Sequence, residues 1–513
     1  MRLESLLAGH ALRRPDREAL ICGEIRVSYS ALQDSVSRAA AGLHRLGVRP
    51  GDRVLLCLPN GVELVQLCYA AFTVGATVVP VNTRLTANEI EHIARDCQPA
   101  VIAYHASGRE VIRAAMPQAM RCPAVAVGGA GGGEVPFEQL LAAPASRLPE
   151  IPVERDDCLI LYTSGTTGEP KGAVNTHANM IVQNVYLCAR EWGIGADERA
   201  LVVTPIAHRA GCARMIIALG LGGTLVIMEK FDPVAALALI ERERVTLAGL
   251  VPTALRMMLP HIREHPAACD SLRTIVVATE AFPPPLKKEL IALLPRARIY
   301  SLFGSSECLV TSLSHDEQSS HPASVGRPIP GIEVRLADDA GRDVAQGEVG
   351  ELLVRDGVPG RGAVMKEYFN RPEETAAALA NGWFHTGDLA RCDDAGYLYI
   401  VDRKQDMVLS GGYNIYSKEV EEVLRSHPGV ADAAVIGVPD ETFGEAVAAF
   451  VEHRGGTRPA AGELIEHCRA QLASYKKPKH VFFIESLPRN SVGKVLKSEL
   501  RALAARDMNQ APA

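Results

Sequence analysis

The sequence lacks several features that mark specialised classes of protein. Its twelve cysteines are scattered and never form a Cys-X-X-Cys pair, which argues against a zinc site or a disulfide framework. The net charge of −6 gives no reason to expect nucleic acid binding. The N-terminal segment has no apolar core followed by a cleavage site, so no secretory leader is expected. These absences favour a protein of the reducing cytoplasm.

A membrane-spanning segment is also not expected. The apolar run at 64–81 is split by Gly75 and closed by Pro80, and a turn at 59–61 precedes it. We interpret it as a buried helix followed by a buried strand. The 513 residues, 47% of them apolar, are enough for about three structural units of a globular protein.

Strand and helix patterns alternate along most of the chain. Strands are predicted at 53–58, 77–81 and 100–104, and helices at 62–74 and from a Thr86–Glu89 capping box onward. This alternation, which returns at 201–250, predicts an α/β fold with parallel sheets covered by helices on both faces. The glycine-rich stretch at 124–150 is predicted to be a surface connection.

The pattern changes after about residue 400. A helix from Ser417, a strand, a helix from about 462 and a further strand predict a small α+β unit, with a domain boundary near Asp402.

The strongest motif spans 162–172, with the sequence Tyr-Thr-Ser-Gly-Thr-Thr-Gly-Glu-Pro-Lys-Gly after an apolar strand. Glycines allow backbone N–H groups to face an anion, while hydroxyl groups and a lysine add donors and charge. The motif therefore predicts a triphosphate-binding loop. Its spacing differs from a Walker loop, and Gly493-Lys494 does not form one either because Pro488 and Val495 occupy key positions. The residues predicted to bind phosphate are Thr163, Ser164, Gly165, Thr166, Thr167, Gly168 and Lys171.

Four further stretches complete a recognisable set. They are Tyr-Ser-Leu-Phe-Gly-Ser-Ser-Glu at 300–307, Gly-Trp-Phe-His-Thr-Gly-Asp-Leu at 382–389, the segment 399–415, and Pro-Arg-Asn-Ser-Val-Gly-Lys-Val at 488–495. In this order and spacing the chain resembles the adenylate-forming superfamily of acyl-CoA synthetases, aryl-CoA ligases, luciferases and adenylation domains. The resemblance runs from Tyr29 to Leu500. It implies a large AMP-binding domain (1–401) of parallel-sheet subdomains with a small β-rich subdomain, and a mobile α+β domain (402–513) hinged near Asp402.

The resemblance also implies individual roles in binding ATP. The loop would wrap the β- and γ-phosphates, and Glu307 would bind Mg²⁺ through its carboxylate. Lys494 would bridge the attacking carboxylate and the α-phosphate as negative charge gathers there. The other residues assigned to the nucleotide are Phe303, Gly304, Ser305, Ser306, Glu280, Ala281, Asp388 and Arg403, with Phe303 stacked on adenine and the last two on the ribose.

The acyl pocket would be gated by His208 and bordered by 278–281, where Thr279-Glu280 replaces the two glycines common in the family. Three arrangements are open for Arg209 and Arg214. In the first, either arginine neutralises Glu280 as scaffold; in the second, either faces solvent or CoA; in the third, they bind a polar group on the acid. The first two are favoured, and a medium-chain or aromatic monocarboxylate is the expected substrate.

CoA is the expected acyl acceptor. Its negatively charged nucleotide end needs cations, and its pantetheine arm needs a narrow channel free of side chains. The residues assigned to it are Arg84, Gly411, Gly412, Phe443, Tyr475, Lys477 and Lys479. The alternatives are an adenylation enzyme that loads a carrier protein, a luciferase-like oxygenase and an inactive binding protein. The oligomeric state is left open, with a homodimer as one arrangement.

Overall fold

The computed structural model describes residues 1–116, 122–142, 144, 148–163, 170–455, 458–490 and 493–510, with only the backbone at 507–510. The chain divides into two compact units. The first contains Met1–Val334 and Val354–Phe384, and the second contains Arg335–Leu353 and His385–Ala513. Compactness does not identify a hinge, so the boundary at Asp402 stays a prediction.

The first unit contains two large sheets, of which one is parallel from β14 to β1 and antiparallel at both edges. Its strands are, in spatial order, β16 (Arg327–Pro328), β15 (Leu309–Leu313), β14 (Arg298–Gly304), β13 (Thr274–Val277), β12 (Leu247–Leu250), β10 (Arg199–Val202), β11 (Thr224–Ile227), β1 (Glu18–Cys22) and β2 (Ile25–Ser28). The predicted return of the α/β pattern at 201–250 is therefore confirmed.

The second sheet of this unit is parallel from β8 to β7. Its strands are β19 (Glu367–Tyr368), β9 (Lys171–Thr176), β8 (Asp157–Thr163), β4 (Thr77–Pro80), β3 (Arg53–Cys57), β5 (Val101–His105), β6 (Ala124–Val127) and β7 (Val135–Pro136). The prediction of a surface connection at 124–150 is wrong for β6, because its apolar residues at 125–127 are buried beside β5.

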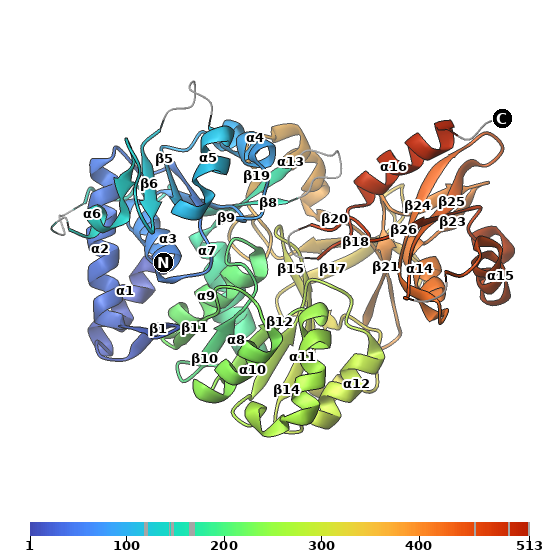
Figure 1. The fold of residues 1–513 in the computed structure, drawn as a ribbon, viewed down its shortest axis with the longest axis horizontal. Coiled ribbons are helices and arrows are strands. Elements are labelled where there is room, and N and C mark those ends of the chain that lie inside the picture. The colour runs from blue at the N-terminus through green and yellow to red at the C-terminus, as the bar shows by residue number, and fades with distance from the viewer. Residues whose placement is uncertain are drawn as a thin grey trace. The chain divides into compact units, whose positions relative to one another are not determined.

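Helices cover these sheets. They are α1 (Leu3–Arg13), α2 (Tyr29–Arg45), α3 (Val62–Val74), α4 (Ala87–Cys97), α5 (Arg109–Ala115), α6 (Phe137–Leu141), α7 (His177–Met180), α8 (Cys188–Trp192), α9 (Arg209–Leu221), α10 (Pro233–Arg242), α11 (Pro252–Glu264), α12 (Pro284–Leu293) and α13 (Pro372–Ala378). Figure 1 shows α10, α11 and α12 in front of the first sheet, where Ile240, Leu255 and Leu290 pack into its core. The capping box predicted at Thr86 begins α4. No helix among the described residues is long and apolar enough to cross a bilayer.

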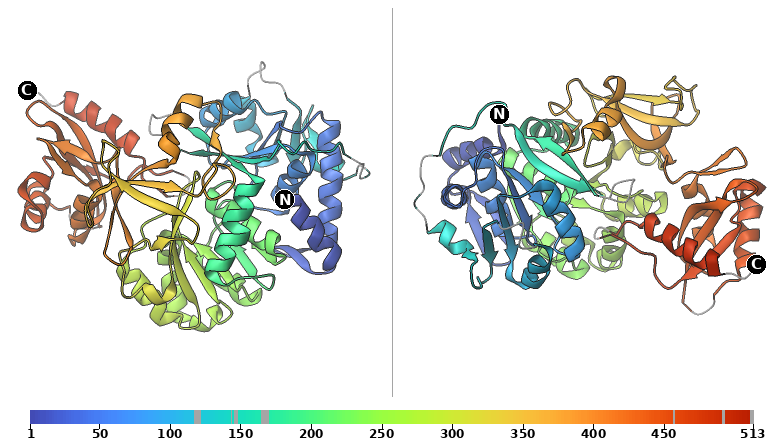
Figure 2. Two further views of the ribbon diagram at one scale, coloured as in Figure 1. Left: turned by 180° about the vertical axis from the view of Figure 1, so that it is seen from behind. Right: turned by 90° about the horizontal axis from the view of Figure 1, so that it is seen from above.

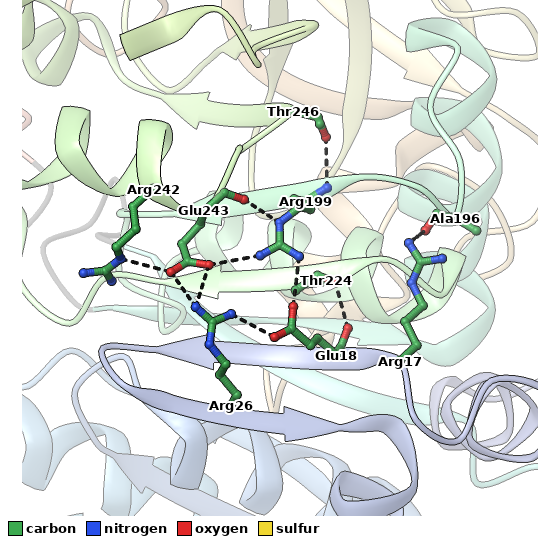
Figure 3. Close-up of polar contacts among 9 residues, drawn as sticks. All are labelled: Arg17, Glu18, Arg26, Ala196, Arg199, Thr224, Arg242, Glu243 and Thr246. Atoms are coloured by element: carbon green, nitrogen blue, oxygen red, sulfur yellow. Dashed lines mark hydrogen bonds and ion pairs between the residues drawn. The ribbon is translucent and has the colours of Figure 1, made fainter.

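A charged cluster joins the N-terminal hairpin to this sheet (Figure 3). The carboxylate of Glu243, just after α10, forms ion pairs with Arg26 of β2 at 2.9 Å and with Arg199 of β10 at 3.1 Å. Arg242 adds a contact of 3.0 Å to the same carboxylate. Because the Glu243 side chain is only 2% exposed, these guanidinium groups supply the counter-charge that burial requires.

The described residues of the second unit form two smaller sheets and the α-helices that cover one of them. One sheet has the order β17 (Glu333–Ala337), β18 (Gly350–Arg355), β20 (Phe384–Cys392) and β21 (Leu398–Arg403). The other has the order β23 (Tyr413–Ile415), β22 (Val408–Ser410), β25 (Gly444–His453) and β24 (Val430–Asp440), with β26 (His480–Ile484) also paired to β25. The helices are α14 (Ser417–Ser426), α15 (Ala461–Gln471) and α16 (Lys497–Gln510).

Side-chain alternation in β24 explains how this second sheet is covered on both faces. Val435 packs with residues of α14 and α15, whereas its neighbour Ile436 packs with Leu500 of α16. Figure 2 shows α16 beside these strands in both of its views. The predicted α/β class, with parallel sheets in the large N-terminal part and a C-terminal α+β domain, is confirmed, while the mobility of that domain remains a prediction.

Candidate active site

The ends of the predicted phosphate loop are held by a β-hairpin. Thr163 of β8 and Lys171 of β9 are directly opposite in the antiparallel register. The Thr163 hydroxyl donates to the Lys171 carbonyl at 3.5 Å. Ser164, Gly165, Thr166, Thr167 and Gly168 lie outside the described residues. The hairpin therefore fixes both ends of a segment that follows the carboxyl end of β8.

Glu307 is buried in a tight turn after β14. Its backbone N–H donates to the Ser305 hydroxyl at 3.1 Å, and its carbonyl accepts from Met365 N–H at 2.6 Å. Tyr368 donates its hydroxyl to Glu307 Oε1 at 3.1 Å, and the Lys171 ammonium lies 5.7 Å from the centre of the same ring. The structure thus brings Lys171 and Glu307 to the same tyrosine. Sequence reasoning missed Tyr368 because it follows Glu307 by about sixty residues in the chain.

A buried amide supports the adjoining residues. Asn175 of β9 is fully buried and donates Nδ2 to the carbonyl of Ser306 at 3.2 Å. Gly304 is needed here, since a Cβ atom would lie 2.6 Å from the carbonyl oxygen of Cys308. Phe303, half-buried, pairs with Thr311 across β14 and β15. The segment 303–307 is therefore held rigidly by neighbouring backbone.

In the second unit, the structure brings Asp388, Arg403 and Lys494 together. Asp388 of β20 and Arg403 of β21 are cross-strand partners, and Arg403 Nε lies 2.9 Å from Asp388 Oδ1. Desolvation, with a further contribution from the Arg403 charge and opposed by Asp388, lowers the pKa of Lys494 to about 8. The Lys494 backbone is fixed by N–H donation to Asn490 Oδ1 at 2.9 Å.

A small cavity of about 20 Å³ lies at the carboxyl ends of β10, β12 and β13, and two residues of the segment 278–281, predicted to border the acyl pocket, line it. Gly211, Ala278 and Thr279 line it, together with Arg214. His208 caps the start of α9 by accepting from Ala210 N–H at 3.3 Å, and burial beside Arg209 lowers its pKa to about 4. The imidazole is therefore neutral near pH 7.

Thr279, which stands where the family commonly has a glycine, keeps a backbone conformation typical of glycine. Its φ of +83° lies in the left-handed region that favours glycine and is rare for a β-branched residue. The neighbouring Glu280 carboxylate accepts from the Thr253 hydroxyl at 3.0 Å and lies 3.8 Å from Arg256, and Ala281 after it is exposed. Two side chains of α11 therefore hold the Glu280 carboxylate.

The expected pairing of Arg209 or Arg214 with Glu280, and the exposure of Arg214 to solvent, are wrong. Neither guanidinium pairs with Glu280, and Arg214 is only 6% exposed, so it does not face solvent. Arg209 donates to the side-chain oxygens of Gln183 and Asn184, in a π-helical turn at Ile181–Leu187. Helical spacing alone does not reveal such a turn.

Most residues assigned to CoA gather on an edge of the second unit. Gly411 and Gly412 form the tip of the β22–β23 hairpin with φ values of +58° and +81°. Gly411 N–H donates to the carbonyl of Phe443 at 2.8 Å, and the Phe443 side chain is 53% exposed. Tyr475 stacks on the adjacent Tyr413 with ring centres 4.5 Å apart.

The cations assigned to CoA have different surroundings. Lys477 donates to the Ser474 carbonyl at 2.9 Å, whereas Lys479 forms an ion pair of 2.5 Å with Asp440. That ion pair, together with backbone N–H donors, lowers the pKa of Asp440. Arg84 is exposed in the first unit.

Comparisons with known proteins agree with this geometry. Residues 7–369 match the family described as AMP-binding enzyme, and residues 419–494 match the AMP-binding enzyme C-terminal domain. A feruloyl-CoA synthase from Amycolatopsis is 39% identical over 95% of this chain and 96% of its own. A long-chain-fatty-acid–CoA ligase from Mycobacterium tuberculosis is 38% identical over 93% of each chain.

The ATP-bound crystal structure of MatB from Rhodopseudomonas palustris superposes with a TM-score of 0.87 at 29% identity, covering 98% of this chain and 99% of its own. The phosphate-loop hairpin and the Glu307 turn fall within residues 7–369, and Lys494 is the last residue of the C-terminal match. The chain therefore belongs to the AMP-binding enzyme family, in its branch of AMP-forming acyl- and aryl-CoA ligases, which use ATP and CoA.

Proposed function

We propose that the enzyme joins a medium-chain or aromatic carboxylic acid to CoA through an acyl-AMP intermediate, releasing AMP and pyrophosphate. The observation that carries the proposal is the arrangement of Glu307, Tyr368 and Lys171. A buried carboxylate and an ammonium group share one tyrosine at the end of the loop that would receive the triphosphate.

Mg²⁺ fits this arrangement. A buried carboxylate is a suitable oxygen ligand for this cation. Glu307 would hold the ion, which would supply positive charge to the triphosphate. Tyr368 would orient the carboxylate, and Lys171 would add a fixed positive charge. Phe303, Gly304, Ser305 and Ser306 would line the nucleotide.

Asp388 and Arg403 would contact the ribose, with Lys494 beside them. A lysine with a pKa of about 8 is still mostly charged at pH 7. That charge would act on the carboxylate and α-phosphate oxygens, where negative charge gathers in the transition state. His208 would remain neutral at the entrance to the acyl pocket.

The exposed edge formed by Gly411, Gly412, Phe443 and Tyr475 supports CoA as the acceptor. The aromatic side chains offer an apolar surface for adenine or pantetheine, and the glycines leave space next to it. Lys477 and Arg84 would bind phosphates. Lys479 would first have to leave Asp440, so we propose a weaker contribution from it. The twelve scattered cysteines, with no Cys-X-X-Cys pair in the sequence, support action in the reducing cytoplasm.

An acid panel tests this function. The protein would be incubated with ATP, Mg²⁺ and each acid, with CoA, hydroxylamine or neither, and nucleotides and thioesters would be identified by mass spectrometry. We expect AMP, pyrophosphate and a CoA thioester from at least one acid. Release of ADP and phosphate would contradict the proposal. Turnover with hydroxylamine but not with CoA would instead favour a carrier protein as the acceptor.

A further inference from the structure

We propose that Arg214 reads a hydrogen-bond-accepting oxygen at the far end of the acid substrate. This inference rests on the proposed function and narrows its substrate class. The expected substrate then has no plain hydrocarbon tail. It is an acid that carries a phenol, keto or second carboxylate oxygen at the end remote from the reacting carboxylate.

The first observation is that two nitrogen atoms of the buried Arg214 guanidinium have no hydrogen-bond partner among the described residues. The side chain is only 6% exposed, yet the residues that the structure describes give its Nε and Nη1 no hydrogen-bond acceptor. The centre of the Trp192 ring lies 5.8 Å from the guanidinium carbon. Buried donors without acceptors are costly and rare in folded proteins, so a ligand or water is expected at these atoms.

The guanidinium is also charged. Burial lowers the pKa of Arg214 to about 10, which leaves it protonated at neutral pH. Arg209, five residues earlier, differs because the amide oxygens of Gln183 and Asn184 accept its donors. Arg214 is therefore the arginine of α9 that has hydrogen-bonding capacity to spare.

A glycine in the facing strand makes this placement possible. A Cβ atom at Gly249 of β12 would lie 2.2 Å from Arg214 Nη2 and 2.6 Å from Nε. Glycine weakens a strand interior and often marks the close approach of another group. Here that group is the guanidinium of Arg214.

The cavity beside Arg214 has the right position and size for an oxygen atom. It lies at the carboxyl ends of parallel strands, the edge at which α/β sheets bind ligands. Its volume of about 20 Å³ accommodates roughly one water-sized group. Apolar side chains, including Val202, Leu250 and Val276, form most of the remaining lining. An acid that places one acceptor oxygen against Arg214 and carbon atoms around it would match both the charged and the apolar parts of the cavity lining.

Matched acids test the inference. The kcat/KM of AMP release would be measured for 3-phenylpropanoate against 3-(4-hydroxyphenyl)propanoate, and for octanoate against octanedioate. We expect the wild-type enzyme to prefer at least one oxygenated acid. Arg214→Met should lower kcat/KM for that acid by about 10- to 100-fold and spare its apolar partner. The two pairs also distinguish a neutral phenol from a second carboxylate.

Two further variants distinguish a loss of substrate recognition from a general loss of folding. Arg214→Lys retains a charge and should recover part of the preference, while Arg263→Met removes an exposed arginine of α11 and should leave it unchanged. Equal losses on both members of a pair, or a wild-type preference for the apolar members, would overturn the inference while leaving CoA ligation intact. If no acid gave AMP at all, the proposed function itself would have failed.

Discussion

The hydroxyl of Tyr368 donates a hydrogen bond of 3.1 Å to Oε1 of Glu307, across a separation of 61 residues in the sequence. The short strand β19 delivers this tyrosine by pairing with β9, the strand that begins with Lys171. One residue therefore couples the carboxylate proposed to bind the metal ion with the end of the phosphate loop.

Tyr368→Phe should weaken the use of Mg²⁺ and ATP without unfolding the enzyme. A hydrogen bond to a charged group contributes about 1.5–3 kcal/mol, so kcat/KM for MgATP should fall by about 10- to 100-fold. The phenyl ring would keep its contact with Lys171. Titrations of ATP at several Mg²⁺ concentrations measure this, with Tyr186→Phe at an exposed position as the matched control. An unchanged Mg²⁺ dependence would contradict the role given to Tyr368.

The charge of Lys494 should be visible in the pH profile of adenylate formation. Desolvation lowers the pKa of Lys494 to about 8, and the active form is the protonated one. The rate of the first half-reaction should therefore fall as pH rises through about 8. Lys494→Ala should cut that rate by several orders of magnitude and largely spare thioester formation from pre-made acyl-AMP.

Lys494→Arg provides the control for this profile, since arginine stays charged throughout the range. Its residual adenylation rate should show no decline near pH 8. The same decline in the arginine variant would assign the titration to another group, and equal losses in both half-reactions would show that Lys494 does not act on adenylation alone.

Several of these features follow from the sequence for identifiable reasons. The β3–α3–β4 pattern, the capping box at Thr86 and the helices from Ser417 depend on local periodicity and capping, which a sequence displays directly. The pairing of Asp388 with Arg403 could be inferred because both belong to recognisable motifs. Tyr368 and the isolation of Arg214 could not, because each depends on a tertiary contact with a segment far away in the chain.

Asp402 should have two separable roles, as a helix cap and as a hinge. The structure shows that this buried carboxylate accepts from the backbone N–H and, at 3.1 Å, from the hydroxyl of Ser417 at the start of α14. Asp402→Ala should therefore destabilise the protein by about 0.5–2 kcal/mol while preserving both half-reactions in the folded fraction. Chemical denaturation and half-reaction assays measure the two effects.

Asp402→Pro additionally fixes φ, so it should lose thioester formation while keeping adenylation. The alanine variant is its matched control, because both substitutions remove the carboxylate. Normal overall turnover in the proline variant would count against a hinge at this position.

The cluster around Glu243 should contribute to stability and not to catalysis. Glu243→Gln leaves Arg26 and Arg199 with a weaker acceptor beside a side chain that is only 2% exposed. Because the arginines can partly reach water, we expect a loss of about 1–3 kcal/mol in the free energy of unfolding. Asp34→Asn in the exposed Arg38–Asp34 pair should change it by less than about 0.5 kcal/mol. Equal effects of the two substitutions would contradict the importance of burial.

Formation of an acyl-AMP intermediate is the central claim, and the fate of the carboxylate oxygen tests it most directly. An accepted acid labelled with oxygen-18 in both carboxylate positions would be turned over with ATP, Mg²⁺ and CoA, and the AMP analysed by mass spectrometry. If the carboxylate attacks the α-phosphate, one labelled oxygen must remain on AMP when CoA displaces it. AMP carrying a single oxygen-18 is the predicted result, and AMP without label would contradict the account.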